Sequence, residues 1–81
     1  MSSKLVFYTT EGCHLCEFAA EMLQRLQQSE GMQELEIETV DISSSEALVE
    51  QYGLTIPVVQ NPETGEEVNW PFEPAQIASL F

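Results

Sequence analysis

The chain has 81 residues, with 2 Lys and Arg against 14 Asp and Glu, so its formal net charge is −12. This length fits one domain, which we expect to span residues 1–81, and a hydrophobic content of 43% is too high for a disordered acidic tail. Two cations argue against binding to nucleic acid or to an anionic membrane. The apolar run at 5–8 is too short for a signal-peptide core, and no run approaches a spanning helix, so we expect a cytoplasmic protein.

The first half of the chain predicts a strand, a helix and a second strand. Residues 5–8 form a continuous apolar run, which is typical of a strand buried on both faces of a parallel sheet. An amphipathic helix follows, with Gly31 as its predicted stop and with one apolar stripe formed by Leu15, Phe18, Ala19, Met22, Leu23 and Leu26. Residues 34–39 alternate acidic and apolar side chains, which indicates a strand at a sheet edge.

The second half predicts a short helix, a β-hairpin and a final helix. Ser43 and Glu46 have the spacing of a capping box, and the helix that they open should end near Tyr52. Turn residues separate two strands of a hairpin over residues 56–69, and Pro74 suits the first position of the last helix. The order β-α-β-α-β-β-α places the chain in the α/β class, with a right-handed crossover between two parallel strands.

Cys13 and Cys16 are the only two cysteines, and they form a C-x-x-C motif. Cys13 falls at the start of the predicted helix, where unpaired backbone N–H groups and the helix dipole favour the nucleophilic thiolate. Cys16 follows three residues later, so it can attack a mixed disulfide on Cys13 and release the partner. The motif therefore predicts thiol–disulfide exchange without a metal or an organic cofactor.

The same residues admit other interpretations. A structural zinc site normally needs four Cys or His ligands, and the rest of the chain adds only His14. A metal or cluster shared between two chains could use both thiols, and two inert core cysteines are a further alternative. His14 could act as a cation near the thiolate, or it could be an exposed residue at the helix start with no role.

Two segments together resemble the thioredoxin superfamily and, within it, the small glutaredoxin-like proteins. They are residues 7–16 (FYTTEGCHLC) and residues 52–58 (YGLTIPV). The resemblance covers essentially the whole chain and implies the minimal thioredoxin fold, a four-stranded mixed sheet flanked by helices. It also implies that Pro57 is cis and lies beside Cys13, and that the backbone of Ile56 pairs with an incoming substrate. The substrate-binding residues that we expect are Thr55, Ile56, Pro57, Tyr8 and His14.

The chain departs from the glutaredoxin pattern where glutathione would bind. Residues 69–74 (NWPFEP) contain no Gly-Gly element, and Lys4 and Arg25 are the only Lys or Arg residues. These departures argue against glutathione as a dedicated co-substrate. We expect Trp70 and Phe72 in this segment to pack under the last helix.

The predicted function is therefore thiol–disulfide oxidoreduction of glutaredoxin-like type, in which Cys13 attacks and Cys16 resolves. The substrates would be protein or small-molecule disulfides, and the charge of −12 favours basic ones. We expect the protein to act as a monomer. The alternative is a binding module on the same fold that recognises a basic protein, with thiols that are incidental or only sense redox state.

Overall fold

The computed structural model describes residues 4–29 and 33–81. Its elements in chain order are β1 (Lys4–Thr9), α1 (His14–Gln28), β2 (Glu36–Asp41), the 3₁₀ helix η1 (Ile42–Ser44), α2 (Glu46–Tyr52), β3 (Val58–Gln60), β4 (Glu67–Asn69) and α3 (Pro74–Ala78). The predicted order of strands and helices is confirmed, with η1 added between β2 and α2. The predicted stop of the first helix, Gly31, lies outside the described residues. The helix ends at Gln28, and Ser29 caps it by donating both its N–H and its hydroxyl to the carbonyl of Leu26.

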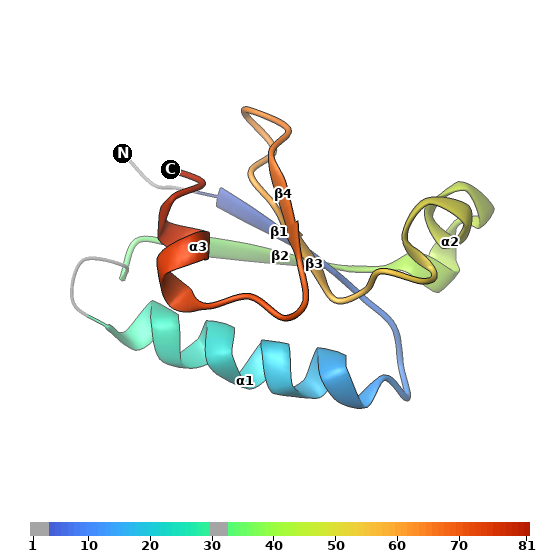
Figure 1. Ribbon diagram of the computed structural model, residues 1–81, viewed down its shortest axis with the longest axis horizontal. Coiled ribbons are helices and arrows are strands. Elements are labelled where there is room, and N and C mark those ends of the chain that lie inside the picture. The colour runs from blue at the N-terminus through green and yellow to red at the C-terminus, as the bar shows by residue number, and fades with distance from the viewer. Residues whose placement is uncertain (1–3, 30–32) are drawn as a thin grey trace.

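A four-stranded mixed sheet in the order β2-β1-β3-β4 forms the centre of the molecule (Figure 1). β1 pairs in parallel with β2 and antiparallel with β3, and β3 pairs antiparallel with β4. The edge position predicted for the second strand is confirmed, but its bounds are shifted by two residues. The register pairs Lys4 with Glu36 and Thr9 with Asp41, and Glu34 lies in a turn before the strand.

The main core lies between the sheet and the helices α1 and α3, which both lie on one side of it (Figure 1). Alternate residues of β1 point into this layer, because successive side chains of a strand face opposite ways. The buried residues that meet there include Leu5, Phe7, Ala19, Leu23, Val59, Phe72 and Ile77. Trp70 is half-buried against the same core and contacts Phe72 edge-on, with ring centroids 5.2 Å apart. The packing role predicted for Trp70 and Phe72 is confirmed.

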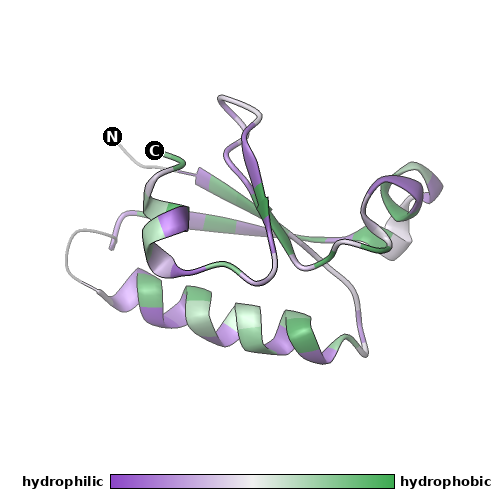
Figure 2. Ribbon diagram, in the orientation of Figure 1, coloured by the Kyte–Doolittle hydropathy of each residue, from purple (hydrophilic) through white to green (hydrophobic). Residues whose placement is uncertain are grey.

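The apolar stripe predicted for the first helix is partly wrong. The buried residues of α1 are Cys16, Ala19, Leu23 and Leu26, whereas Leu15 is 47% exposed and Phe18 is 59% exposed. Apolar residues cover more of the helix circumference than the sheet can cover. The small side chain of Ala19 allows a close approach, so the line through Cys16 and Ala19 faces the sheet. Figure 2 shows hydrophobic and hydrophilic stretches alternating along α1.

The capping box predicted at Ser43 and Glu46 is also wrong. Ser43 lies in η1 and donates its N–H (2.9 Å) and its hydroxyl (2.8 Å) to the Asp41 carboxylate. Ser43, which was predicted to cap α2, is thus hydrogen-bonded to Asp41 instead. These hydrogen bonds lower the pKa of Asp41. α2 starts at Glu46, later than a cap at Ser43 implied, and ends at Tyr52, as predicted. In the part of the chain that the structure describes, no helix is long and apolar enough to cross a bilayer.

Candidate active site

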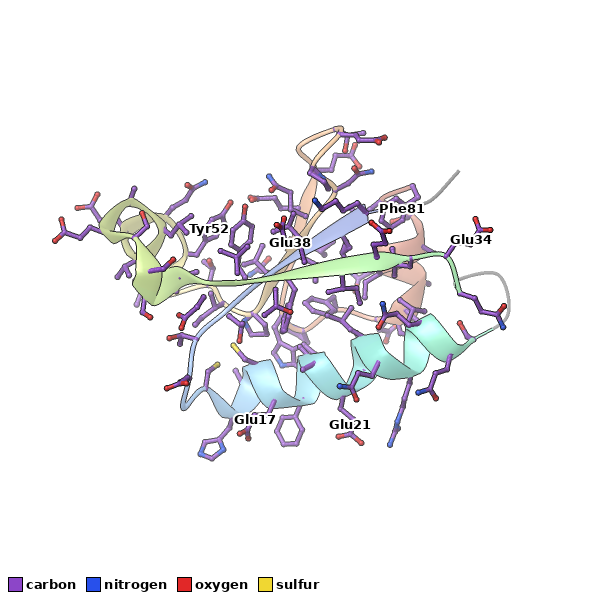
Figure 3. All side chains as sticks on the ribbon, turned by 180° about the vertical axis from the view of Figure 1, so that it is seen from behind. Glu17, Glu21, Glu34, Glu38, Tyr52 and Phe81 are labelled. Carbon is purple, nitrogen blue, oxygen red and sulfur yellow. The ribbon has the colours of Figure 1, made fainter. Side chains whose placement is uncertain are left out.

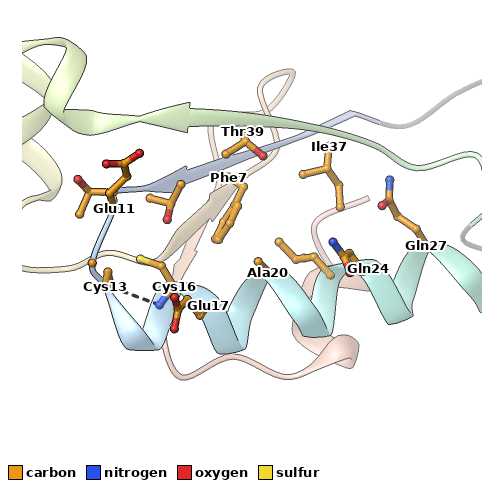
Figure 4. Close-up of a pocket in the computed structure, with 14 residues that line it drawn as sticks. Phe7, Glu11, Cys13, Cys16, Glu17, Ala20, Gln24, Gln27, Ile37 and Thr39 are labelled. Atoms are coloured by element: carbon orange, nitrogen blue, oxygen red, sulfur yellow. Dashed lines mark hydrogen bonds between the residues drawn. The ribbon is translucent and has the colours of Figure 1, made fainter.

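Cys13 is the N-cap residue of α1, and the local sequence explains this position. Gly12 has φ +77°, in the left-handed region that glycine adopts most readily, and it turns the chain from β1 into the helix. The Sγ atom of Cys13 accepts a hydrogen bond from the backbone N–H of Cys16 at 3.2 Å (Figure 4). Sulfur thus takes the place that a serine or aspartate oxygen usually takes at a helix start. A donor N–H and the positive end of the helix dipole thus both face this sulfur.

The second cysteine differs from the first in its surroundings. Cys16 is buried in the main core, while Cys13 is half-buried at its margin. Burial raises the pKa of the Cys16 thiol, and a side-chain hydrogen bond between the two thiols raises it further. Both thiols are free. The pair therefore combines one accessible sulfur at a helix start with one buried sulfur that is held as a thiol near neutral pH.

A cavity of about 470 Å³ opens beside the two cysteines, between α1 and the strands β1 and β2 (Figure 4). Its apolar part is formed by Phe7, Ala20, Leu23 and Ile37. The carboxylates of Glu11 and Glu17 lie at the end where the cysteines are, and the amides of Gln24 and Gln27 lie at the other end. The arrangement can hold a molecule larger than a simple thiol next to Cys13.

The sequence did not reveal most of this cavity. Ala20, Gln24 and Gln27 occupy one flank of α1, and Ile37 and Thr39 occupy the inward positions of β2. Each pattern is visible in the sequence, at helical and strand spacing. However, only the packing of α1 over β2 brings the two sets of side chains together.

His14 lies on the outer surface of α1 and does not line the cavity. Its Nδ1 is 3.6 Å from Oε2 of Glu17, and the two side chains are 90% and 76% exposed. A contact this exposed contributes little to stability. A contact of His14 with substrate stays a prediction.

The segment that was expected to bind substrate adjoins the same core. The Ile56–Pro57 bond is cis, as predicted, and Pro57 is buried. Ile56 and Cys13 both pack against the main core, and the hydroxyl of Thr55 donates to the carbonyl of Tyr52 at 3.3 Å. Thr55, Ile56 and Pro57 do not line the cavity. Their contacts with substrate, and the proximity of Pro57 to Cys13, stay predictions.

Tyr8 belongs to a second, smaller cluster formed around Ile42, Tyr52 and Val58. Its ring stacks on that of Tyr52, with centroids 4.3 Å apart, and its hydroxyl donates to Gln60 at 3.1 Å. Figure 3 shows Tyr52 at the end of the sheet near α2. Tyr52 donates in turn to the carboxylate of Glu67, and burial raises the pKa of its phenol. Tyr8 is thus held in a tyrosine stack and does not line the cavity, so its predicted contact with substrate stays a prediction.

Known proteins share this fold. Residues 4–81 match the family model described as Glutaredoxin-like domain (DUF836). The chain is similar to XcR50 from X. campestris, with 32% identity over 93% of this chain and 91% of that one and a TM-score of 0.73. It is also similar to Ne2328 from Nitrosomonas europaea, with 30% identity over 98% of this chain and 91% of that one and a TM-score of 0.78.

A more distant structure supports the fold assignment alone. Thioredoxin 1 from Thermosipho africanus TCF52B has 15% identity over 95% of this chain and 88% of that one, with a TM-score of 0.67. No curated protein sequence matches the chain significantly. The fold is therefore the thioredoxin-like α/β fold that the sequence predicted.

Proposed function

The chain belongs to the glutaredoxin-like domain family, and we propose that it is a thiol–disulfide oxidoreductase working through Cys13 and Cys16. The observation that carries this proposal is the asymmetry of the two thiols. Cys13 lies half-buried at a helix start, beside a cavity, and accepts a hydrogen bond there. Cys16 lies in the core less than one helical turn later, and its pKa is raised by burial. This is the division of labour that a nucleophile and a resolving cysteine need.

In the reducing direction, the Cys13 thiolate attacks one sulfur of a substrate disulfide R–S–S–R′. A bond forms between Cys13 and the R sulfur, the substrate S–S bond breaks, and R′ leaves as a thiolate that takes a proton from solvent. Cys16 then gives its proton to solvent and attacks the sulfur of Cys13. The Cys13–Cys16 disulfide forms, and R leaves as a thiolate. The protein dithiol has lost two electrons, and the substrate disulfide has gained them.

A thiol reductant must restore the dithiol by the same steps in reverse. The charge of the chain supports a reductant other than glutathione, which is anionic. Lys4 pairs with Glu38 at 3.6 Å and Arg25 pairs with Glu21 at 2.8 Å, so both Lys and Arg side chains already have carboxylate partners. We place the reaction in the cytoplasm, because a dithiol has to be regenerated in a reducing compartment.

A redox titration tests the proposal. Protein equilibrated in buffers of fixed thiol-to-disulfide ratio is quenched with acid, and its free thiols are tagged and counted by mass. We expect the two free thiols to disappear together, in one transition with a two-electron slope. A binding module with incidental thiols would instead keep two free thiols or form separate mixed disulfides, and that result would contradict the proposal.

A further inference from the structure

We propose that the cavity between α1 and β2 is the binding groove for a substrate peptide that carries a basic residue next to its disulfide-bonded cysteine. This inference rests on the oxidoreductase function proposed above and names the substrate class. The groove begins beside Cys13, where a mixed disulfide would form, so a bound peptide would continue from that sulfur along α1.

The length of the groove suits a short extended peptide. Gln27 donates its side-chain N–H to the carbonyl of Leu35 at 2.9 Å, which ties α1 to the start of β2 at the far end. The stretch of helix from Cys13 to Gln24 is about 16 Å long at roughly 1.5 Å per residue, or about five residues of extended chain. The volume of about 470 Å³ also lies within the range of roughly 300–1,000 Å³ for ligand sites.

The lining of the groove matches the mixed chemistry of a peptide. Figure 4 shows Ile37 and Thr39 of β2 facing Ala20 and Gln24 of α1 across this space. The apolar groups can receive apolar side chains, while the hydroxyl of Thr39 and the amide of Gln24 can hydrogen-bond to a peptide backbone.

The charge at the cysteine end selects for a cation. Glu11 and Glu17 line this end, and no Lys or Arg does. Glu11 has no ion pair among the residues that the structure describes, and Glu17 meets only the exposed imidazole of His14. Lys4 and Arg25 are held by Glu38 and Glu21. A Lys or Arg beside the substrate cysteine would therefore supply the missing positive charge, and the net charge of −12 would speed its approach.

The first experiment varies the charge. Three five-residue peptides carry Lys, Gln or Glu beside a cysteine, and each cysteine is activated as a mixed disulfide with the same aromatic thiol. Release of that thiol by the reduced protein gives the rate of the first step, and we expect Lys to exceed Glu by roughly 10-fold at low salt. The double variant Glu11→Gln/Glu17→Gln should lose most of this preference. The control Glu63→Gln/Glu66→Gln, in the exposed hairpin, removes the same amount of charge and should keep most of the preference for the lysine peptide.

The second experiment fills the groove. Ala20→Leu should slow the lysine peptide several-fold more than it slows cystamine, a small cationic disulfide that does not extend along α1. Ala47→Leu, on the exposed surface of α2, is the matched control and should slow neither. The proposal that the peptide binds in this groove is contradicted if both double variants lose the preference equally. It is also contradicted if Ala20→Leu slows the peptide and cystamine equally. If no disulfide reacts with the wild-type protein at all, the proposed function fails instead.

Discussion

The backbone N–H of Cys16 donates to the Sγ atom of Cys13 across 3.2 Å, so the residue that we propose as the resolving cysteine also helps to hold the proposed nucleophile. Two separate parts of Cys16 carry these two roles. Its backbone belongs to the first turn of α1 and points at Cys13, while its side chain enters the core beneath the helix. This arrangement has consequences for reactivity, stability and substrate charge.

The two thiols should differ in their reaction with an alkylating agent. Iodoacetamide should modify Cys13 first at neutral pH, because burial keeps Cys16 protonated as well as covered. In the Cys13→Ser variant, modification of Cys16 should accelerate only as the pH rises above the ordinary cysteine pKa of 9.0. Mass spectrometry of timed samples gives both rates, and unfolded protein is the control. Equal rates for Cys16 in the folded and unfolded chain at neutral pH would contradict this.

Replacing Leu23 tests which face of α1 is buried. Leu23→Ala should lower the free energy of unfolding by about 2–5 kcal/mol, because the side chain is fully buried between helix and sheet. Phe18→Ala, a change of similar kind on the same helix, should change it by no more than about 0.5 kcal/mol, because Phe18 is mostly exposed. Urea unfolding measures both. A larger loss of unfolding free energy for Phe18→Ala would show that Phe18 is buried, as the stripe predicted from the sequence requires.

These two residues also show what the sequence could predict about the fold. Periodicity identified a helix with an apolar side, but Leu15, Phe18, Ala19 and Leu23 are all apolar, so the pattern could not say which line faces the sheet. Packing against β1 makes that choice. Local competition explains the failed capping box in the same way, since Asp41 is two positions from Ser43 while Glu46 is three, and Asp41 accepts hydrogen bonds from both the N–H and the hydroxyl of Ser43.

The candidate site was predictable only in its local part. Three adjacent signals, a strand, a glycine and a C-x-x-C, were sufficient to place Cys13 at the helix start. The groove depends on Ala20 and Ile37, which are 17 positions apart in the sequence and meet only through the parallel crossover. The stacking of Tyr8 on Tyr52 is likewise a contact between distant elements that no periodicity indicates.

The Tyr52 phenol should make stability depend on alkaline pH. Burial, followed by the hydrogen bond to Glu67, raises its pKa above the ordinary 10.0, so the folded state keeps a proton that the unfolded state loses. Stability from this group is therefore present below about pH 10 and falls as the pH rises above it. Urea unfolding at about pH 9 and about pH 11 gives the free energy of unfolding at each pH. Its fall between the two pH values should be smaller for Tyr52→Phe than for the wild type. Equal falls would mean that Tyr52 ionises normally.

Salt should weaken the discrimination between charged disulfides. At low salt the reduced protein should react faster with cystamine than with a dicarboxylate disulfide, by roughly 10-fold or more, because the summed field of the acids attracts cations. Raising the salt to about 0.5 M should bring the two rates together, since the screening length is then only a few ångströms. The comparison must use rates corrected for the pKa of each leaving thiol. A preference for the anionic disulfide would show that the acids do not govern the approach to Cys13.

Two single variants separate the attack by Cys13 from the resolution by Cys16. Reduced Cys16→Ser and Cys13→Ser proteins are each mixed with a peptide disulfide, quenched with acid and analysed by intact mass. We expect Cys16→Ser to accumulate one mixed disulfide on Cys13 and Cys13→Ser to accumulate almost none over the same time. If Cys13→Ser forms the mixed disulfide as fast as Cys16→Ser does, Cys13 is not the nucleophile, which contradicts the proposed mechanism.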